Sequence, residues 1–159
     1  MPAVPLSALE KAMKLLSRRA LSQKELTEKL FRAGFPEEEV EHAVSECCRR
    51  HFIDDTMLAE DYTSLLRARN SGSRVIRQKL QRRGLGAELG ENGVLPEEDS
   101  AQQEREAAMR ALDYKWRLLS RENDPRKKRE KAFRFLAGRG FSPGLIFELL
   151  NNLPESEDC

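Results

Sequence analysis

The sequence has few of the residues on which disulfide frameworks, metal centres and membrane spans depend. It contains three cysteines and two histidines in 159 residues, and aromatic residues make up 6% of it. No apolar run approaches the roughly 20 residues that a bilayer span needs. The first residues also lack the basic and then apolar pattern of a secretory leader. These absences predict a soluble, cytoplasmic protein whose cysteines stay reduced.

The cysteines and histidines offer one conceivable metal site, formed by Cys47 and Cys48 with His42 and His51. A closed zinc site needs four ligands that converge on one point. Adjacent cysteines rarely converge, and a buried free cysteine behaves as a small apolar residue. We therefore expect no metal and no cofactor.

The adjacent pair Asp54 and Asp55 is the only hint of acid/base chemistry. Consecutive residues of a helix point about 100° apart, so the two carboxylates would not act on one substrate atom. Helix capping explains the pair more simply. We therefore expect a protein that is not an enzyme.

Charge is abundant but unevenly distributed. The 28 basic and 27 acidic residues nearly cancel, to a net charge of +1. Residues 62–86, however, contain seven basic and no acidic residues, residues 35–61 contain two and nine, and residues 107–141 contain eleven and four. Alternating blocks could form charged stripes, or they could simply attract each other as neighbouring helices. Surface ion pairs contribute only about 0–1 kcal/mol each. Attraction between neighbouring helices would therefore explain the charge blocks without any binding function.

Apolar residues recur at helical spacing throughout, which predicts an all-α fold. Ser7 and Ser22 are each followed three residues later by glutamate, the pattern of a capping box. We expect helices at about residues 7–19, 22–33, 36–50, 54–70, 73–83, 100–120, 125–139 and 143–150, with at most a short helix in 86–96. The expected inward residues of the first helix are Leu9, Ala12, Met13 and Leu16, and those of the fourth are Met57, Leu58, Tyr62, Leu65 and Leu66.

One short pattern occurs three times, at intervals of 50 and 56 residues. An apolar residue is followed four positions later by another, then after four more by glycine and a large apolar residue. The three copies are Leu26, Leu30, Gly34 and Phe35; Ile76, Leu80, Gly84 and Leu85; and Ala132, Leu136, Gly140 and Phe141. A left-handed glycine with an apolar residue after it is a common helix C-cap. Periodicity of this kind predicts tandem helical repeats, here three-helix repeats at 7–52, 53–97 and 98–153 with an acidic tail at 154–159, in an elongated molecule.

The acid-free segment is the candidate binding element. On a helical projection Leu80 lies beside Ile76, whereas Arg74, Arg77 and Arg82 lie on the flank and far side. We expect a basic surface that contacts a partner. The candidate partner-binding residues are Arg67, Arg69, Arg74, Arg77, Lys79, Arg82, Arg83, Lys127 and Lys128.

Four segments resemble the RecX family, the regulators of the bacterial RecA recombinase. They are LLSRRALSQKEL, FIDDTMLAEDYTSLLR, SGSRVIRQKLQRRGL and KREKAFRFLAGRGFSPGLI, which together span most of residues 8–150. The resemblance implies tandem three-helix units in a curved, elongated all-α molecule. It also implies binding to the RecA nucleoprotein filament and suppression of its recombinase, ATPase and co-protease activities in DNA repair and the SOS response, without catalysis. The sequence departs from the family pattern at residues 86–96 and at Ser73, where proline is usual and where we expect serine to cap the helix.

A second interpretation is a helical-repeat nucleic-acid-binding protein whose arginines neutralise phosphates. Few aromatic residues are free for base stacking, since Tyr62 and Trp116 fit core positions, and the acidic blocks would repel a DNA backbone. Some direct contact with single-stranded DNA remains compatible with the pattern. The sequence does not distinguish capping of filament ends from binding in the filament groove or severing of the filament. It also leaves the oligomeric state open.

Overall fold

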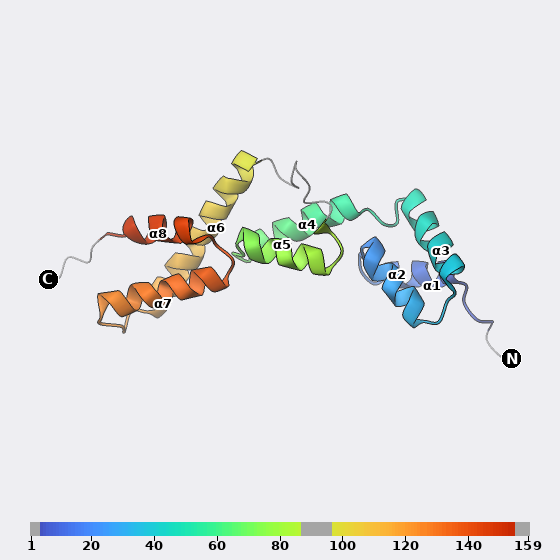
Figure 1. The fold of residues 1–159 in the computed structure, drawn as a ribbon, viewed down its shortest axis with the longest axis horizontal. Helices are drawn as coiled ribbons and strands as arrows, with labels where there is room; N and C mark the ends of the chain where they lie inside the picture. Colours follow the sequence, from blue (N-terminus) through green and yellow to red (C-terminus); the bar gives the residue numbers. More distant parts are fainter. Residues whose placement is uncertain (1–3, 87–96, 155–159) are drawn as a thin grey trace. The chain divides into compact units, whose positions relative to one another are not determined.

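The structure is a computed structural model that describes residues 4–86 and 97–154. Within them the chain forms eight α-helices and no strand, which confirms the all-α prediction (Figure 1). The helices are α1 (Ala8–Leu16), α2 (Gln23–Arg32), α3 (Glu37–Arg49), α4 (Asp55–Ala68), α5 (Ser73–Arg82), α6 (Glu97–Leu118), α7 (Pro125–Gly138) and α8 (Pro143–Asn151). The short helix considered for residues 86–96 and most of the acidic tail lie outside the described residues.

Both predicted capping boxes are present. Ser22 Oγ accepts a hydrogen bond from the Glu25 backbone nitrogen at 3.1 Å, and Glu25 Oε2 accepts one from the Ser22 nitrogen at 2.9 Å. Ser7 and Glu10 make the same reciprocal pair at the start of α1. Each cap satisfies two backbone N–H groups that would otherwise lack an acceptor in the first turn.

The two adjacent aspartates cap different helices. Asp54 Oδ1 accepts from the Met57 nitrogen at 3.0 Å and so caps α4. Asp55 Oδ1 accepts from the nitrogen of Gln23, the first residue of α2, also at 3.0 Å. The capping interpretation of this pair is therefore confirmed, with one aspartate serving a helix distant in sequence.

Two predicted helix starts were wrong. Pro36 is the N-cap of α3 and not its first helical residue. Helix α6 begins at Glu97, three residues before the expected start at Ser100. The segment around Glu97 repeats the proline and acidic residues that open α3, because PEED at 96–99 matches PEEE at 36–39. Acidic residues in a first turn are favoured by the helix dipole, so this pattern was a better start signal than Ser100 with Gln103 three residues later.

The three marker glycines end helices as predicted, each in the left-handed region with φ between 75° and 97°. After each glycine, the next N–H bonds to the carbonyl five positions back: Phe35 to Leu30, Leu85 to Leu80 and Phe141 to Leu136. This is the hydrogen bond of a Schellman cap. The same cap ends α3 and α4 at two residues that are not glycine, His51 and Asn70, both with φ of 59°. The sequence analysis did not foresee these two.

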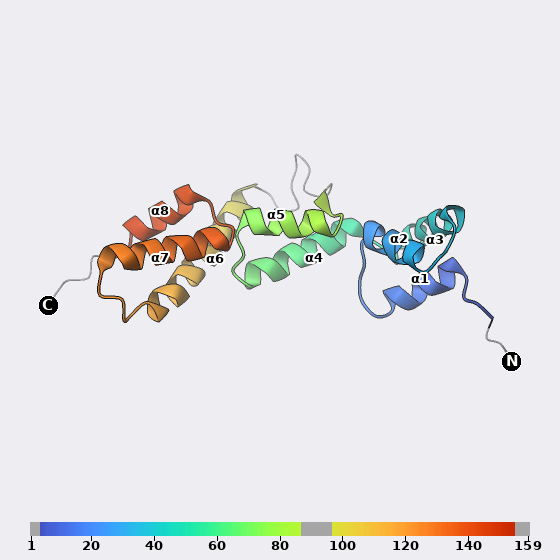
Figure 2. The same ribbon diagram turned by 60° about the horizontal axis from the view of Figure 1, so that its bottom comes forward.

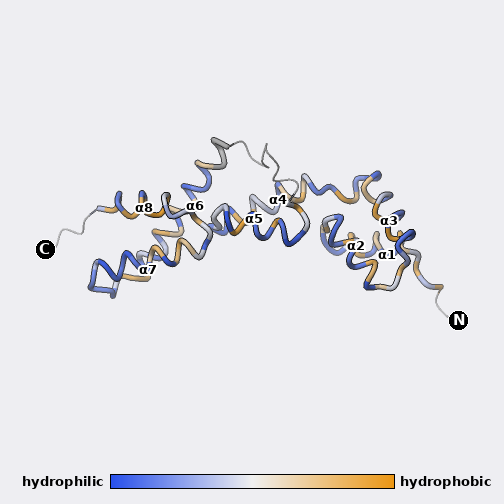
Figure 3. Tube along the Cα trace, viewed as in Figure 1, coloured by the Kyte–Doolittle hydropathy of each residue, from blue (hydrophilic) through white to orange (hydrophobic). Residues whose placement is uncertain are grey.

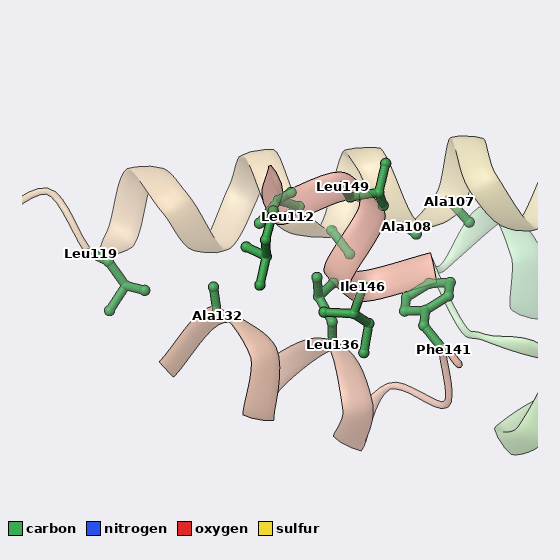
Figure 4. Packing of buried hydrophobic residues seen from close by; sticks show 11 residues of the cluster. Ala107, Ala108, Leu112, Leu119, Ala132, Leu136, Phe141, Ile146 and Leu149 are labelled. Atoms are coloured by element: carbon green, nitrogen blue, oxygen red, sulfur yellow. The ribbon is translucent and has the colours of Figure 1, made fainter. Parts of the chain in front are cut away.

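The chain divides into two compact units, and the division falls after Tyr62 in α4 and before Leu80 in α5. The first unit contains the bundle of α1, α2 and α3, around a core that includes Leu26, Leu30 and Val40. The second contains the bundle of α6, α7 and α8 (Figures 1 and 2). Figure 4 shows Leu136, Ile146 and Phe141 gathered in its core.

Several residues expected in the core are exposed instead. Met13, Met57 and Leu65 have exposed fractions of 43%, 61% and 44%. The buried positions of α1 and α4 are mostly small: Ala8, Ala12, Ala59 and Thr63, with the larger Leu66 and Arg67. Small residues allow close helix packing, which leaves the larger side chains at the edges.

Within the described residues, no helix has the length and apolar character of a membrane span.

Candidate binding surface

Some basic residues of segment 62–86 make contacts within the molecule, and others face solvent. Arg67 makes contacts within the molecule. Only 7% of Arg67 is exposed. Its guanidinium donates to the Ser71 carbonyl oxygen at 3.3 Å and to Ser73 Oγ at 2.9 Å. Burial lowers the pKa of Arg67, and the negative charge of Glu104 opposes that shift. This arginine holds the α4–α5 connection.

Arg83 is also used within the molecule. Its Nε and Nη2 atoms donate to the two carboxylate oxygens of Glu25 at 2.9 and 3.1 Å, a bidentate pair. Its guanidinium lies 4.8 Å from the ring centroid of Tyr62. The hydrogen bond to Glu25 raises the pKa of Arg83. For Glu25, partial burial acts in the opposite direction, but the hydrogen bonds from Arg83 and Ser22 outweigh it and lower the pKa.

The contacts of Arg83 form a joint between the first and second repeats. The Arg83 carbonyl oxygen accepts from Ser22 Oγ, and Arg83 Nη2 donates to the Ala20 carbonyl oxygen at 3.3 Å. One repeat later, the Arg139 carbonyl oxygen accepts from the Gly72 nitrogen at 2.8 Å, and Arg139 Nε donates to the Asn70 carbonyl oxygen at 3.3 Å.

These two joints are equivalent, because Asn70 and Gly72 lie 50 residues after Ala20 and Ser22, the interval of the first two marker glycines. An arginine precedes each of the last two marker glycines, and its role in the joint was not predicted. Arg-Gly at 83–84 and 139–140 was an available signal, since the first repeat has Ala33 in that place.

The second joint depends on backbone contact. A Cβ atom on Gly72 would lie 2.2 Å from the carbonyl carbon of Gly140, and one on Gly140 would lie 2.6 Å from the Val75 nitrogen. Beside this contact, the Ser73 nitrogen donates to Glu104 Oε1 at 3.0 Å. Ser73 is the first residue of α5, so the expectation that it caps the helix was wrong. Proline at this position could not donate to Glu104, because it has no N–H.

The remaining basic residues of α5 face solvent. Arg74, Arg77 and Arg82 are exposed, as the projection predicted, and Lys79 is half-buried. Arg74 Nη2 donates to the Ala137 carbonyl oxygen at 2.9 Å, near the end of α7. Among the residues whose side chains the structure describes, 4–86 and 101–154, the side chains of Arg77 and Arg82 make no ion pair or hydrogen bond. We call Arg77, Gln78, Gln81 and Arg82 the α5 basic face.

The other candidate residues lie elsewhere. Arg69 is exposed after the end of α4, where its carbonyl oxygen accepts from Arg139. Lys127 is exposed in the hydrophilic first part of α7 (Figure 3). The Lys128 ammonium lies 4.2 Å from the ring centroid of Trp116, a cation–π contact. Arg77, Arg82, Arg69 and Lys127 are therefore the candidates whose side chains are open to a partner.

The two cysteines of α3 are free thiols that are partly or fully buried. Cys47 is buried and Cys48 half-buried, both as free cysteines, and burial raises the pKa of both thiols. In the part of the chain that the structure describes, no group of three or more His, Cys, Asp or Glu residues could hold a metal ion.

Comparison with known proteins identifies the family. Residues 8–47 match the model for the RecX first three-helix domain, and residues 102–150 match the model for the RecX third three-helix domain. The regulatory protein RecX of Neisseria meningitidis serogroup B is 32% identical over 152 residues, which cover 94% of each chain. The chain belongs to the RecX family.

Other RecX proteins agree with this assignment. The regulatory protein RecX of Deinococcus radiodurans is 32% identical over 144 residues, covering 91% of this chain and 67% of the relative. The crystal structure of RecX from Lactobacillus salivarius superposes with a TM-score of 0.76 at 20% identity, covering 91% of this chain and 92% of that one. The fold of tandem three-helix domains is thus shared with RecX. The boundaries of the three repeats given above stay a prediction.

Proposed function

We propose that this protein binds the filament that RecA recombinase forms on DNA and suppresses its recombinase, ATPase and co-protease activities. Membership of a family of regulatory proteins supports this role. The observation that carries it is the α5 basic face, where two exposed arginines have no partner among the described residues. The protein acts in the cytoplasm, in DNA repair and the SOS response, by binding and not by catalysis.

The α5 basic face is suited to an acidic surface. Arg77 and Arg82 lie on a helix with no acidic residue, and the whole segment 62–86 also lacks one. Arginine binds carboxylates and phosphates with paired donors, so it can contact either the recombinase or its bound DNA. Arg69 and Lys127 are proposed as further contacts, whereas Arg67 and Arg83 support the fold.

The test is a double charge reversal, Arg77→Glu with Arg82→Glu. Arg74 stays unchanged, because its bond to the Ala137 carbonyl makes it partly structural. DNA-dependent ATP hydrolysis by RecA is measured against inhibitor concentration. We expect half-inhibition to need at least tenfold more of the variant, which corresponds to about 1.4 kcal/mol of lost binding. Like charges placed opposite each other can cost several kcal/mol, so two reversals suffice for this change.

The matched control is Arg32→Glu with Arg134→Glu, which changes the net charge equally at two exposed arginines outside α5. We expect the control to inhibit as the wild type does. Circular dichroism and melting temperature should show that both variants are folded. A folded Arg77→Glu, Arg82→Glu variant that inhibits at the wild-type concentration would contradict the proposed contact face.

The alternative function, direct nucleic-acid binding, is favoured by the same two exposed arginines. The salt dependence of DNA binding distinguishes this alternative from binding to the RecA filament. Binding to phosphates of naked single-stranded DNA weakens linearly on a log–log plot against salt, by about 0.7 per phosphate contacted. We expect weak binding to naked DNA at every salt concentration and strong binding to DNA coated with RecA. Tight, steeply salt-dependent binding to naked DNA would favour the alternative.

A further inference from the structure

An apolar pocket lies in the first compact unit and uses none of the residues of the α5 basic face. Met13, Leu16 and Ser17 line it from the end of α1, and Phe52 lines it from the segment after α3. Its volume is about 260 Å³. This is slightly below the roughly 300–1,000 Å³ of typical small-molecule sites, so the pocket fits one or two side chains of a peptide better than a cofactor.

The pocket holds large apolar side chains that the fold leaves in solvent. The exposed fractions of Met13 and Phe52 are 43% and 48%. The bundle core beside them is already filled by Ala8, Ala12 and Cys47, each at most 4% exposed. Met13 and Phe52 therefore add little to the packing of this unit, although burying either against a partner would be favourable.

Basic residues adjoin the lining residues in sequence. Lys14 follows Met13, Arg18 follows Ser17, and Arg49 and Arg50 precede Phe52 by two or three positions; all four are exposed. Methionine is a flexible residue that adapts to different partners. An apolar pocket with basic neighbours is complementary to an apolar side chain that has acidic neighbours.

Acidic residues do not cancel this positive charge. The Glu46 carboxylate accepts hydrogen bonds from both arginines, at 3.0 Å from Arg49 Nε and 2.6 Å from Arg50 Nε. Hydrogen bonds from these two arginines lower the pKa of Glu46 to about 2, so it stays ionised. One carboxylate for two guanidiniums leaves a positive surplus. The other acidic residues close in sequence are Glu10, Asp54 and Asp55, which accept hydrogen bonds from backbone N–H groups at the starts of α1, α4 and α2.

We propose that this pocket binds a short acidic peptide segment of a partner protein through one apolar side chain, with Met13 and Phe52 as the apolar contacts and Lys14 and Arg18 as the ionic ones. Binding of this kind gives the protein a second contact, independent of the α5 basic face. Electrostatic attraction speeds the encounter, and burial of the apolar side chain slows release. The pocket is then a docking site that places the regulator near proteins bearing acidic tails.

The test uses fluorescence anisotropy with a fluorescein-labelled peptide of sequence DEDLFEDE and the full-length protein. DEDSSEDE lacks the apolar side chains, and KRKLFKRK reverses the charge. We expect DEDLFEDE to bind and each comparison peptide to bind at least tenfold more weakly, a difference of about 1.4 kcal/mol. Affinity should also fall between 50 and 500 mM salt, because exposed charges are screened.

Phe52→Ala should weaken binding of DEDLFEDE at least tenfold. Its matched control is Phe31→Ala, which removes a phenylalanine with a similar exposed fraction, 46%, from α2 of the same unit. Lys14→Gln with Arg18→Gln should weaken binding and flatten its salt dependence, whereas Arg32→Gln should do neither. The variant Arg77→Glu, Arg82→Glu should bind the peptide normally, which separates this inference from the proposed function.

Equal binding of DEDSSEDE, unchanged binding to Phe52→Ala, or no binding of DEDLFEDE up to millimolar protein would overturn the proposal. Competition for the pocket by an eight-nucleotide single strand would also overturn it, because it would assign the pocket to nucleic acid. Sedimentation velocity tests a further outcome, self-association of the chain. Self-association that disappears in Phe52→Ala would show that a second copy of this chain covers the pocket.

Discussion

The backbone nitrogen of Gly72 donates a hydrogen bond to the carbonyl oxygen of Arg139 across 2.8 Å. The residue after Arg139 is Gly140, and the two glycines leave no room for a side chain between their backbones. In the equivalent joint, Ser22 donates through its hydroxyl to the carbonyl of Arg83. The two joints therefore perform the same connection, one with a side chain and the other with backbone alone.

Gly72→Ala should destabilise the protein by about 1–3 kcal/mol, the usual cost of overpacking. Its new Cβ would lie 2.2 Å from Gly140. Two other glycines separate the causes. Gly34→Ala should cost about 1–2 kcal/mol through its φ of 91° alone, since no atom described lies within 4 Å of the added Cβ. Gly138→Ala, in α7 and equally open, should stabilise by about 0.5–1 kcal/mol. Urea denaturation measures all three.

Arg67→Ala should destabilise the protein and Arg77→Ala should not, although both arginines lie in the same basic segment. Loss of buried Arg67 removes the donors to Ser71 and Ser73, and we expect the free energy of unfolding to fall by at least about 1.5–3 kcal/mol. Exposed Arg77 should be neutral within about 0.5 kcal/mol. Guanidinium denaturation checks the difference, and equal stabilities would contradict the structural role of Arg67.

Leu80→Ala should cost about 2–5 kcal/mol, because Leu80 is fully buried and its truncation leaves a cavity. Met57→Ala removes a side chain of similar size that is 61% exposed, and its effect should stay within about 0.5 kcal/mol. Chemical denaturation monitored by far-UV circular dichroism compares the two. A large effect of Met57→Ala would mean that its exposed side chain is packed in solution.

The folding stability of the protein should depend on pH through the ionisation of Glu25. Its pKa is lowered in the folded protein from an ordinary value of 4.5. The ionised carboxylate therefore contributes stability above about pH 4.5, and this contribution is lost as the pH falls through the lowered pKa. Glu25→Gln should reduce stability at pH 7 and lose less on acidification below pH 4.5 than the wild type. Denaturation midpoints between pH 7 and pH 3 measure this, with Glu28→Gln, exposed on the same helix, as the control. Parallel curves for Glu25→Gln and wild type would contradict the prediction.

Local signals in the sequence predicted the eight described helices and most of their ends. The capping box of Ser22 and the left-handed turn at Gly84 each use hydrogen bonds between residues close in sequence, so both could be predicted from neighbouring residues. Contacts between distant segments were not predictable in this way. Met13 fits an apolar stripe, but Ala8 and Ala12 take the buried face because α3 packs closely on α1.

The candidate site shows the same limit. The projection placed Arg77 and Arg82 correctly on the exposed side of α5. It could not distinguish Arg83 from them, because the partner of Arg83 is Glu25, 58 residues away. Arg67 looked equally free in sequence, and its burial depends on Ser71 and Ser73 in the turn that follows.

The division of the chain inside α4 and α5 bears on how this protein can be cut or spliced. The sequence period counts residues 53–97 as one module, yet the two helices in that range share their residues between the two compact units. An excised second module would lose the Arg83 contacts with Glu25 at one end and the Gly72 contact with Arg139 at the other. Chimeras joined at the sequence period would cut through both compact units and would break these contacts.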